Sequence, residues 1–186
     1  AATLGAPVIF FCRNNGYAIS TSVEDQYAGD GIISRAPGYG MAGIRVDGND
    51  LFAVNAAVNA ARSYCLENNA PVLVEAMTYR QGHHSTSDDS TRYRGTDEVN
   101  KFADTFNPIQ RMHNFLDLYG WMNTDEIAQI RDEERLAVLD AMEAAESKPP
   151  PKLEALFQDV YQNVPEHLQR QEHELLEHIA KYPGEY

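Results

Sequence analysis

The sequence predicts an α/β protein in which a parallel sheet is flanked by helices and followed by a helical C-terminal region. The short apolar run at 8–12 is typical of a strand buried on both faces, and two further strands are predicted at 43–46 and 71–77. A helical pattern at 51–66 separates the last two runs, and such alternation favours parallel strands with helices on their faces. Mostly helical patterns follow residue 100.

The first predicted strand, 8–12, ends at the turn-forming sequence Asn14-Asn15-Gly16. About 25 residues, rich in glycine, separate it from the next strand, and loops of that length in compact domains are usually functional or mobile. The second strand, 43–46, is stopped by Asp47-Gly48. Asp50 is then placed to cap the helix at 51–66, whose apolar residues recur every three or four positions.

The remainder of the chain is predicted to be a polar loop followed by helices. The loop covers 80–98 and contains almost no aliphatic residues. Helices are expected to resume near Asn107, with Pro108 at the first helical position. This first helix is expected to end by Gly120. A longer helix follows, opened by a capping box of Asn123 and Glu126, and is broken at 148–152. A short segment at 156–161 and a last helix from about 165 to 180 complete the chain.

Composition divides the chain near residue 100, into an α/β part (1–100) and a helical part (101–186). The net charge is −13, of which −4 falls in the first part and −9 in the second. So acidic a chain is a poor binder of nucleic acid or anionic lipid, and no apolar run approaches the roughly 20 residues that span a bilayer. Cys12 and Cys65 lie in apolar surroundings, which favours buried thiols in a reducing compartment.

The first segment with chemical potential is Arg13-Asn14-Asn15-Gly16-Tyr17, directly after the first strand. Ligands of parallel sheets bind outside the carboxyl ends of the strands. An asparagine oxygen and a nearby backbone carbonyl suit Mg²⁺, and Arg13 could pair with a phosphate beside the metal. Taken by itself, the segment could equally be no more than a turn.

The second segment, 79–94, contains adjacent histidines and a run of hydroxyl side chains. A zinc site is disfavoured because no cysteine lies nearby and no third histidine stands at helical spacing. A histidine on such a loop can pass or stabilise a proton near neutral pH. A phosphate in the run from Ser85 to Ser90 would find arginine partners in Arg80, Arg92 and Arg94. A solvated surface loop is the alternative interpretation.

Four motifs in this order resemble the alpha subunits of thiamine diphosphate-dependent branched-chain 2-oxo acid dehydrogenases. Pyruvate dehydrogenase alpha subunits share the layout, but their loop typically reads His-Gly-His-Ser where this sequence has Gly-His-His-Ser. The likeness covers nearly the whole chain, including the tail at 156–161. Its motifs are FCRNNGYAIS at 11–20, RVDGND at 45–50, EAMTYR at 75–80 and HHSTSDD at 83–89.

The resemblance implies a thiamine diphosphate-binding fold, incomplete at the N-terminus, and a role for individual residues. Asn15 through its side chain and Tyr17 through its carbonyl would ligate Mg²⁺, and Arg13 would contact the diphosphate. His84 would touch the cofactor and assist reductive acylation of the lipoyl group, whereas His83 would serve loop structure. Ser85 matches a serine that a dedicated kinase phosphorylates to switch the enzyme off.

The resemblance also implies partners and a compartment. A separate beta subunit would complete an alpha2beta2 heterotetramer, alongside a lipoyl-bearing acyltransferase core and a regulatory kinase and phosphatase. The family's acidic Mg²⁺ ligand lies upstream of Asn15, outside this sequence, so this chain alone is expected to be inactive. The expected location is the mitochondrial matrix, or the cytoplasm if the source is bacterial. The alternatives are a pyruvate or acetoin dehydrogenase alpha subunit and a non-catalytic interaction fragment that holds no cofactor.

Overall fold

The computed structural model describes residues 1–184 and divides into two compact units, Ala1–Ala128 and Gln129–Tyr186. The first unit contains the sheet and both candidate segments, and the second is helical. The division between the units falls later than the change of composition near residue 100. The assignment of 1–100 and 101–186 as separate functional parts therefore stays a prediction.

Three parallel strands form the sheet in the order β1 (Ile9–Asn14), β5 (Val72–Met77) and β4 (Ala42–Asp47). Asn14 and Asp47 both pair in register with Met77, so all three strands end at one edge. This arrangement confirms the predicted parallel sheet. It also places the segment that follows β1 beside the segment that follows β5, because both leave the sheet at the same edge.

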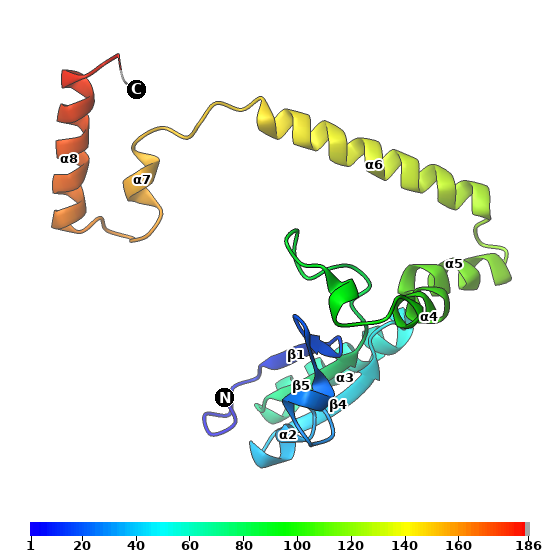
Figure 1. The fold of residues 1–186 in the computed structure, drawn as a ribbon. Helices are drawn as coiled ribbons and strands as arrows, with labels where there is room; N and C mark the ends of the chain where they lie inside the picture. The colour runs from blue at the N-terminus through cyan, green and yellow to red at the C-terminus, as the bar shows by residue number, and fades with distance from the viewer. Residues whose placement is uncertain (185–186) are drawn as a thin grey trace. The chain divides into compact units, whose positions relative to one another are not determined.

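The core lies between the sheet and α3 (Leu51–Asn68), which Figure 1 shows alongside the strands. Ala61 and Cys65 of the helix pack against Val72 and Val74 of the central strand. Small residues on the helix let its backbone approach the sheet closely. The helix begins where predicted, since the Asp50 side chain accepts hydrogen bonds of 3.0 Å from the Phe52 and Ala53 amides. Both cysteines are free thiols, Cys65 buried and Cys12 half-buried.

The long connection between β1 and β4 is more ordered than the sequence predicts. It contains a hairpin, β2 (Tyr17–Ala18) with β3 (Thr21–Ser22), and two short helices, α1 (Val23–Gln26) and α2 (Arg35–Gly38). α2 covers the sheet face opposite α3 and buries Ala36. Elements of two to four residues are too short to produce a periodic pattern, so tertiary contacts decide them.

The prediction of a loop through residue 98 was wrong at its end. Beyond a single turn, η1 (Ser90–Arg92), the helix α4 (Thr96–Phe106) begins eleven residues before Asn107. Phe102 of α4 stacks on Tyr79, with ring centroids 4.1 Å apart. The first turn of α4 is as polar as the loop before it, so the sequence does not show where the helix begins. Asn107 then caps α5 (Pro108–Leu118), as predicted.

The capping box predicted for the next helix, α6 (Thr124–Glu146), is confirmed. Asn123 accepts hydrogen bonds from the amides of Asp125 and Glu126, and the Glu126 carboxylate accepts one from the Asn123 amide. α7 (Ala155–Gln158) and α8 (Glu166–Lys181) follow the proline-rich break in the second unit. Among residues 1–184, no helix combines the length and apolar character needed to cross a membrane.

Candidate functional site

A cavity of about 640 Å³ lies at the edge where β1 and β5 end. Its walls come from the turn after β1, from the start of α1, from the ends of β4 and β5 and from α4. The residues that line it include Asn15, Tyr17, Asn49, Thr78, Glu98 and Phe102. The sequence-predicted metal ligands, Asn15 and Tyr17, therefore share one cavity at the carboxyl edge of the sheet, which is where parallel sheets bind ligands.

The turn that carries these two residues is held by asparagine side chains. The Asn14 oxygen accepts a hydrogen bond of 3.1 Å from the Gly16 amide, and the Asn15 oxygen accepts one of 3.1 Å from the Tyr17 amide. Gly16 has φ +83°, a left-handed conformation that favours glycine. The turn interpretation and the metal interpretation are compatible, because an amide oxygen has two lone pairs and can accept a hydrogen bond while facing a cation.

Arg13, the predicted diphosphate contact, is exposed on β1 next to this turn. Within residues 1–184 it forms no ion pair with an acidic side chain. It is not among the residues that line the cavity. Its guanidinium is therefore available for an external anion, while nothing in its own surroundings fixes its direction.

Tyr17 is anchored to α4 and to the end of β5. Its hydroxyl and that of Tyr79 each donate a hydrogen bond of 3.0 Å to the same oxygen of Glu98. Burial raises the pKa of both phenols, and the hydrogen bonds to Glu98 raise them further. Both tyrosines therefore stay protonated and act as donors, which fixes the ring of Tyr17, while the role of its backbone carbonyl as a metal ligand stays a prediction.

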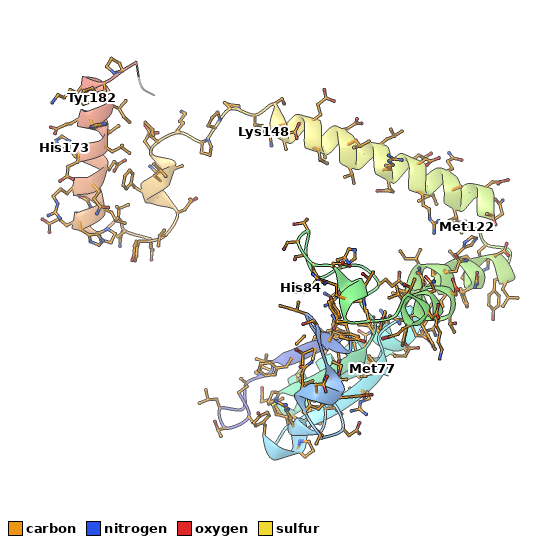
Figure 2. All side chains as sticks on the ribbon, viewed as in Figure 1. Met77, His84, Met122, Lys148, His173 and Tyr182 are labelled. Atoms are coloured by element: carbon orange, nitrogen blue, oxygen red, sulfur yellow. The ribbon has the colours of Figure 1, made fainter. Side chains whose placement is uncertain are left out.

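The second candidate segment extends beyond the end of β5, as Figure 2 shows for Met77 and His84. Arg94 closes this loop at its base. Its buried guanidinium donates hydrogen bonds to the carbonyls of Arg80, Gln81 and Gly82 and to the Ser90 hydroxyl. It also lies over the Tyr79 ring at 5.2 Å. One side chain thus joins both ends of the loop.

A chain of polar contacts then joins this loop to the hairpin after β1. Arg80 donates hydrogen bonds of 2.7 Å to the Ile19 carbonyl and to the Tyr93 hydroxyl, and Tyr93 donates one of 2.7 Å to Asp88. Asp88 also accepts a hydrogen bond from the His84 amide at 2.8 Å. These donors, that of His84 first, lower the pKa of Asp88 and keep it ionised.

His84 and Ser85 are exposed at the tip of the loop. Within residues 1–184, only the backbone amide of His84 is engaged, so its imidazole is free to meet a substrate or cofactor. The Ser85 hydroxyl lies 3.3 Å from that of Ser87 and is accessible to a modifying enzyme. His83 differs from His84, because its Nδ1 accepts a hydrogen bond of 3.1 Å from the Ser90 amide.

The expectation that Arg94 would pair with a phosphate in the run from Ser85 to Ser90 was wrong. Its guanidinium is buried, and its terminal nitrogens already donate to the loop carbonyls. Arg80 is similarly committed to Ile19 and Tyr93. Arg92 is exposed and makes no hydrogen bond or ion pair through its side chain in the described part of the chain, so it is the flanking cation that remains available.

No group of three or more histidine, cysteine, aspartate or glutamate side chains that could hold a metal ion occurs within residues 1–184. The oxygens of Asn15 and Tyr17 are instead an amide and a carbonyl, which are suitable donors for Mg²⁺. Two ligands are a partial set. The residues present therefore fit one side of a magnesium diphosphate site.

Sequence reasoning missed two acidic residues that organise this region. Glu98 receives both tyrosines, and Glu75, in the middle of β5, is fully buried. A signal for Glu75 is present in the sequence, because a lone carboxylate inside the apolar run VLVEAM is rarely buried unless it is paired. For Glu98, the periodic apolar residues of α4 are the available signal.

Comparisons with known proteins confirm the resemblance described above. The sequence profile of the family described as "Dehydrogenase E1 component" matches residues 1–154. The chain is 51% identical over its full length to 2-oxoisovalerate dehydrogenase subunit alpha, mitochondrial, of Homo sapiens, covering 42% of that protein. The identity is 50% to the protein of the same name in Caenorhabditis elegans, of which it covers 43%, and 45% to "2-oxoisovalerate dehydrogenase subunit alpha 1, mitochondrial" of Arabidopsis thaliana, of which it covers 39%. The chain thus spans about two fifths of the length of these curated relatives.

Proposed function

Because the chain belongs to the dehydrogenase E1 component family, we propose that it is part of the alpha subunit of a branched-chain 2-oxo acid dehydrogenase. The enzyme oxidatively decarboxylates branched-chain 2-oxo acids and transfers the acyl group to lipoyl groups. The observation that supports this proposal is the turn of Asn15 and Tyr17, since both residues, the candidate oxygen ligands, line one cavity at the carboxyl edge of the sheet. The similarity of the chain to relatives named 2-oxoisovalerate dehydrogenase supports an enzyme for branched-chain 2-oxo acids over one for pyruvate or acetoin.

Thiamine diphosphate, when bound, supplies the electron sink for decarboxylation. The task of this chain is to hold and orient the diphosphate end. Asn15 through its side-chain oxygen and Tyr17 through its carbonyl would hold the Mg²⁺ that accompanies the diphosphate, and Arg13 would pair with the phosphate charge. Glu98 accepts a hydrogen bond of 3.0 Å from the Tyr17 hydroxyl and so would keep the turn in place around a bound metal.

His84 is the catalytic residue that we assign to this chain, and it also contacts the cofactor. Its imidazole is exposed and carries no internal hydrogen bond, so it can approach the bound cofactor and the incoming lipoyl group. The contact of its amide with Asp88 orients the backbone while leaving the ring free to hold or pass a proton.

The alpha subunit would assemble with a beta subunit as an alpha2beta2 heterotetramer and serve a lipoyl-bearing acyltransferase core. The name "subunit alpha" carried by the relatives supports a multi-subunit enzyme, and their description as mitochondrial supports the mitochondrial matrix. Ser85 is the site at which a regulatory kinase and phosphatase would act. Its exposed hydroxyl, one residue from His84, supports control at this position.

Calorimetry tests the metal-ligand assignment. The full-length alpha subunit carrying this sequence is purified with its beta subunit, and thiamine diphosphate is titrated in the presence of Mg²⁺. Asn15→Ala is expected to weaken binding at least tenfold, because it removes a ligand oxygen. Asn59→Ala, an exposed asparagine on α3, is the matched control and should bind as wild type does. If Asn15→Ala bound the cofactor with unchanged affinity, the ligand assignment would be wrong.

A further inference from the structure

Glu75 is a carboxylate in the central strand of the sheet, with its side chain fully buried. Burying a charge costs free energy unless hydrogen bonds compensate for the lost water. Here four donors do so. The Asn14 side-chain amide and the Ile32 backbone amide donate to Oε1 at 2.8 and 2.7 Å, and the Ile33 amide and Arg45 donate to Oε2 at 3.1 and 3.0 Å.

This arrangement is poorly explained by stability alone. Replacing a buried ion pair by apolar residues of similar volume is often neutral or stabilising, so such a pair is weak evidence for a stabilising role. Leu73, two residues earlier and therefore on the same face of the strand as Glu75, is a buried apolar residue, so this face accommodates apolar side chains. The carboxylate is better explained by what it imposes on its partners.

The partner that matters is Asn14, whose side-chain amide has one donor end and one acceptor end. Burial alone raises the pKa of Glu75, but its donors, Asn14 first, hold the pKa below the ordinary value, so the group is ionised and accepts only. Therefore only the NH₂ end of Asn14 can face it. The oxygen end must then point the other way, where it accepts the hydrogen bond of the Gly16 amide at 3.1 Å.

Gly16 is the residue between Asn15 and Tyr17, so this hydrogen bond acts directly on the turn between the two proposed ligands. We propose that Glu75 is a positioning residue that orients the metal-binding turn by fixing the direction of the Asn14 side-chain amide. The inference rests on the function proposed above. Glu75 is buried in the strand and does not line the cavity, but in this proposal it controls the geometry of two candidate ligands that do.

The other oxygen of the carboxylate provides an internal control. Oε2 accepts from Arg45, which in turn pairs with the exposed carboxylate of Asp30 at 2.8 Å. This side of the network ties down the segment before α2, and within residues 1–184 neither Arg45 nor Asp30 forms a hydrogen bond with Asn14. A change at Asp30 therefore perturbs the same buried carboxylate without touching the path to the turn.

The experiment uses the full-length alpha subunit in complex with its beta subunit. Two quantities are measured: the affinity for thiamine diphosphate with Mg²⁺, by calorimetry, and the thermal midpoint of the cofactor-free complex. Glu75→Gln keeps the size of the side chain but can present either end of an amide to Asn14. Its affinity is expected to fall about tenfold or more, as for other residues that orient metal ligands. Asn14→Ala should produce a similar loss, and Asp30→Asn should bind as wild type does.

The double variant Glu75→Gln, Asn14→Ala separates this path from independent effects. If Glu75 acts through Asn14, the Glu75 change has no further effect once Asn14 is alanine, so the double variant loses no more affinity than Asn14→Ala alone. Additive losses would overturn the inference, as would a lowered thermal midpoint with unchanged affinity in Glu75→Gln. Should Glu75→Gln fail to assemble, Asn14→Ala decides by itself, because unchanged affinity there would mean that the Asn14 side chain does not orient the turn.

The outcomes also distinguish this inference from the proposed function. If the wild-type complex shows no Mg²⁺-dependent binding of thiamine diphosphate, the proposed function fails and this inference fails with it. If the wild type binds, Asn15→Ala weakens binding and Glu75→Gln does not, only the positioning role of Glu75 is wrong.

Discussion

The hydroxyl of Tyr17 donates a hydrogen bond of 3.0 Å to the carboxylate of Glu98, 81 positions later in the chain. The contact joins the turn after β1 to the first part of α4, and the same carboxylate oxygen also receives Tyr79. The rings of Tyr17 and Tyr79 meet edge to face with centroids 6.3 Å apart. One acidic residue therefore fixes the helix, the end of the sheet and the candidate metal turn to each other.

Removing this carboxylate is expected to loosen the region. Glu98→Ala leaves two half-buried phenols without their acceptor, and we expect a loss of about 2 kcal/mol of stability, seen as a lower thermal midpoint of the purified complex. Asp97→Ala is the control, because Asp97 is exposed in the same helical turn and carries the same charge. Equal shifts of the thermal midpoint in the two variants would mean that Glu98 stabilises the protein only through its charge near the start of the helix, and not through its hydrogen bonds to the tyrosines.

Asp50 has two separable roles at the start of α3. One oxygen caps the helix, and the other pairs with Arg111 at 3.2 Å. We expect Asp50→Ala to destabilise the protein by about 1–2 kcal/mol and Asp50→Asn by less than about 1 kcal/mol, since asparagine keeps the cap and loses only a partly exposed ion pair. Thermal melting of both variants tests this order, and a greater loss in Asp50→Asn would contradict it.

Glu75 is expected to make stability dependent on acid. Its pKa is lowered in the folded protein, so its contribution is complete above its ordinary value of 4.5 and is lost as the pH falls through the lowered value. Arg45, the cation that pairs with Glu75, stays charged over this pH range. Cys12 on β1 is a neutral neighbour, because burial and then the charge of Glu75 raise the pKa of its thiol. Melting curves from about pH 7 to about pH 3.5 should show a smaller loss of thermal midpoint in Glu75→Gln than in wild type. If the thermal midpoint fell by the same amount with pH in wild type and in Glu75→Gln, the prediction would be wrong.

A negative charge at Ser85 is expected to lower lipoyl acylation. Phosphate adds about −1.5 to −2 charges beside His84, close to where the anionic diphosphate is proposed to bind. Ser85→Glu reproduces part of that charge, and acylation of a lipoyl domain by the reconstituted complex is the measurement. Ser87→Glu, two residues further along the same exposed loop, is the matched control and should have a smaller effect. Unchanged turnover in Ser85→Glu would count against control at this site.

Much of the fold follows from local patterns in the chain. The three strands, α3 with its Asp50 cap, the Asn107 and Asn123 caps and the proline-rich break all occur close to where their sequence signals predict them. These features depend on residues within a few positions of each other, so that periodicity and capping chemistry are sufficient to find them. The start of α4 escaped prediction because its first turn is as polar as the loop before it.

The sequence by itself determined the parallel sheet, the helix α3 with its cap and the two segments that carry the candidate site. It could not determine how those segments are held. The direction of the Asn14 amide is set by Glu75, 61 positions away, and the loop of His84 is tied to the Ile19 carbonyl by Arg80 over the same separation. Only the tertiary structure decides such contacts, because a hydrogen bond between distant residues leaves no periodic pattern in the chain and exists only once the strands bring its partners to the same edge of the sheet.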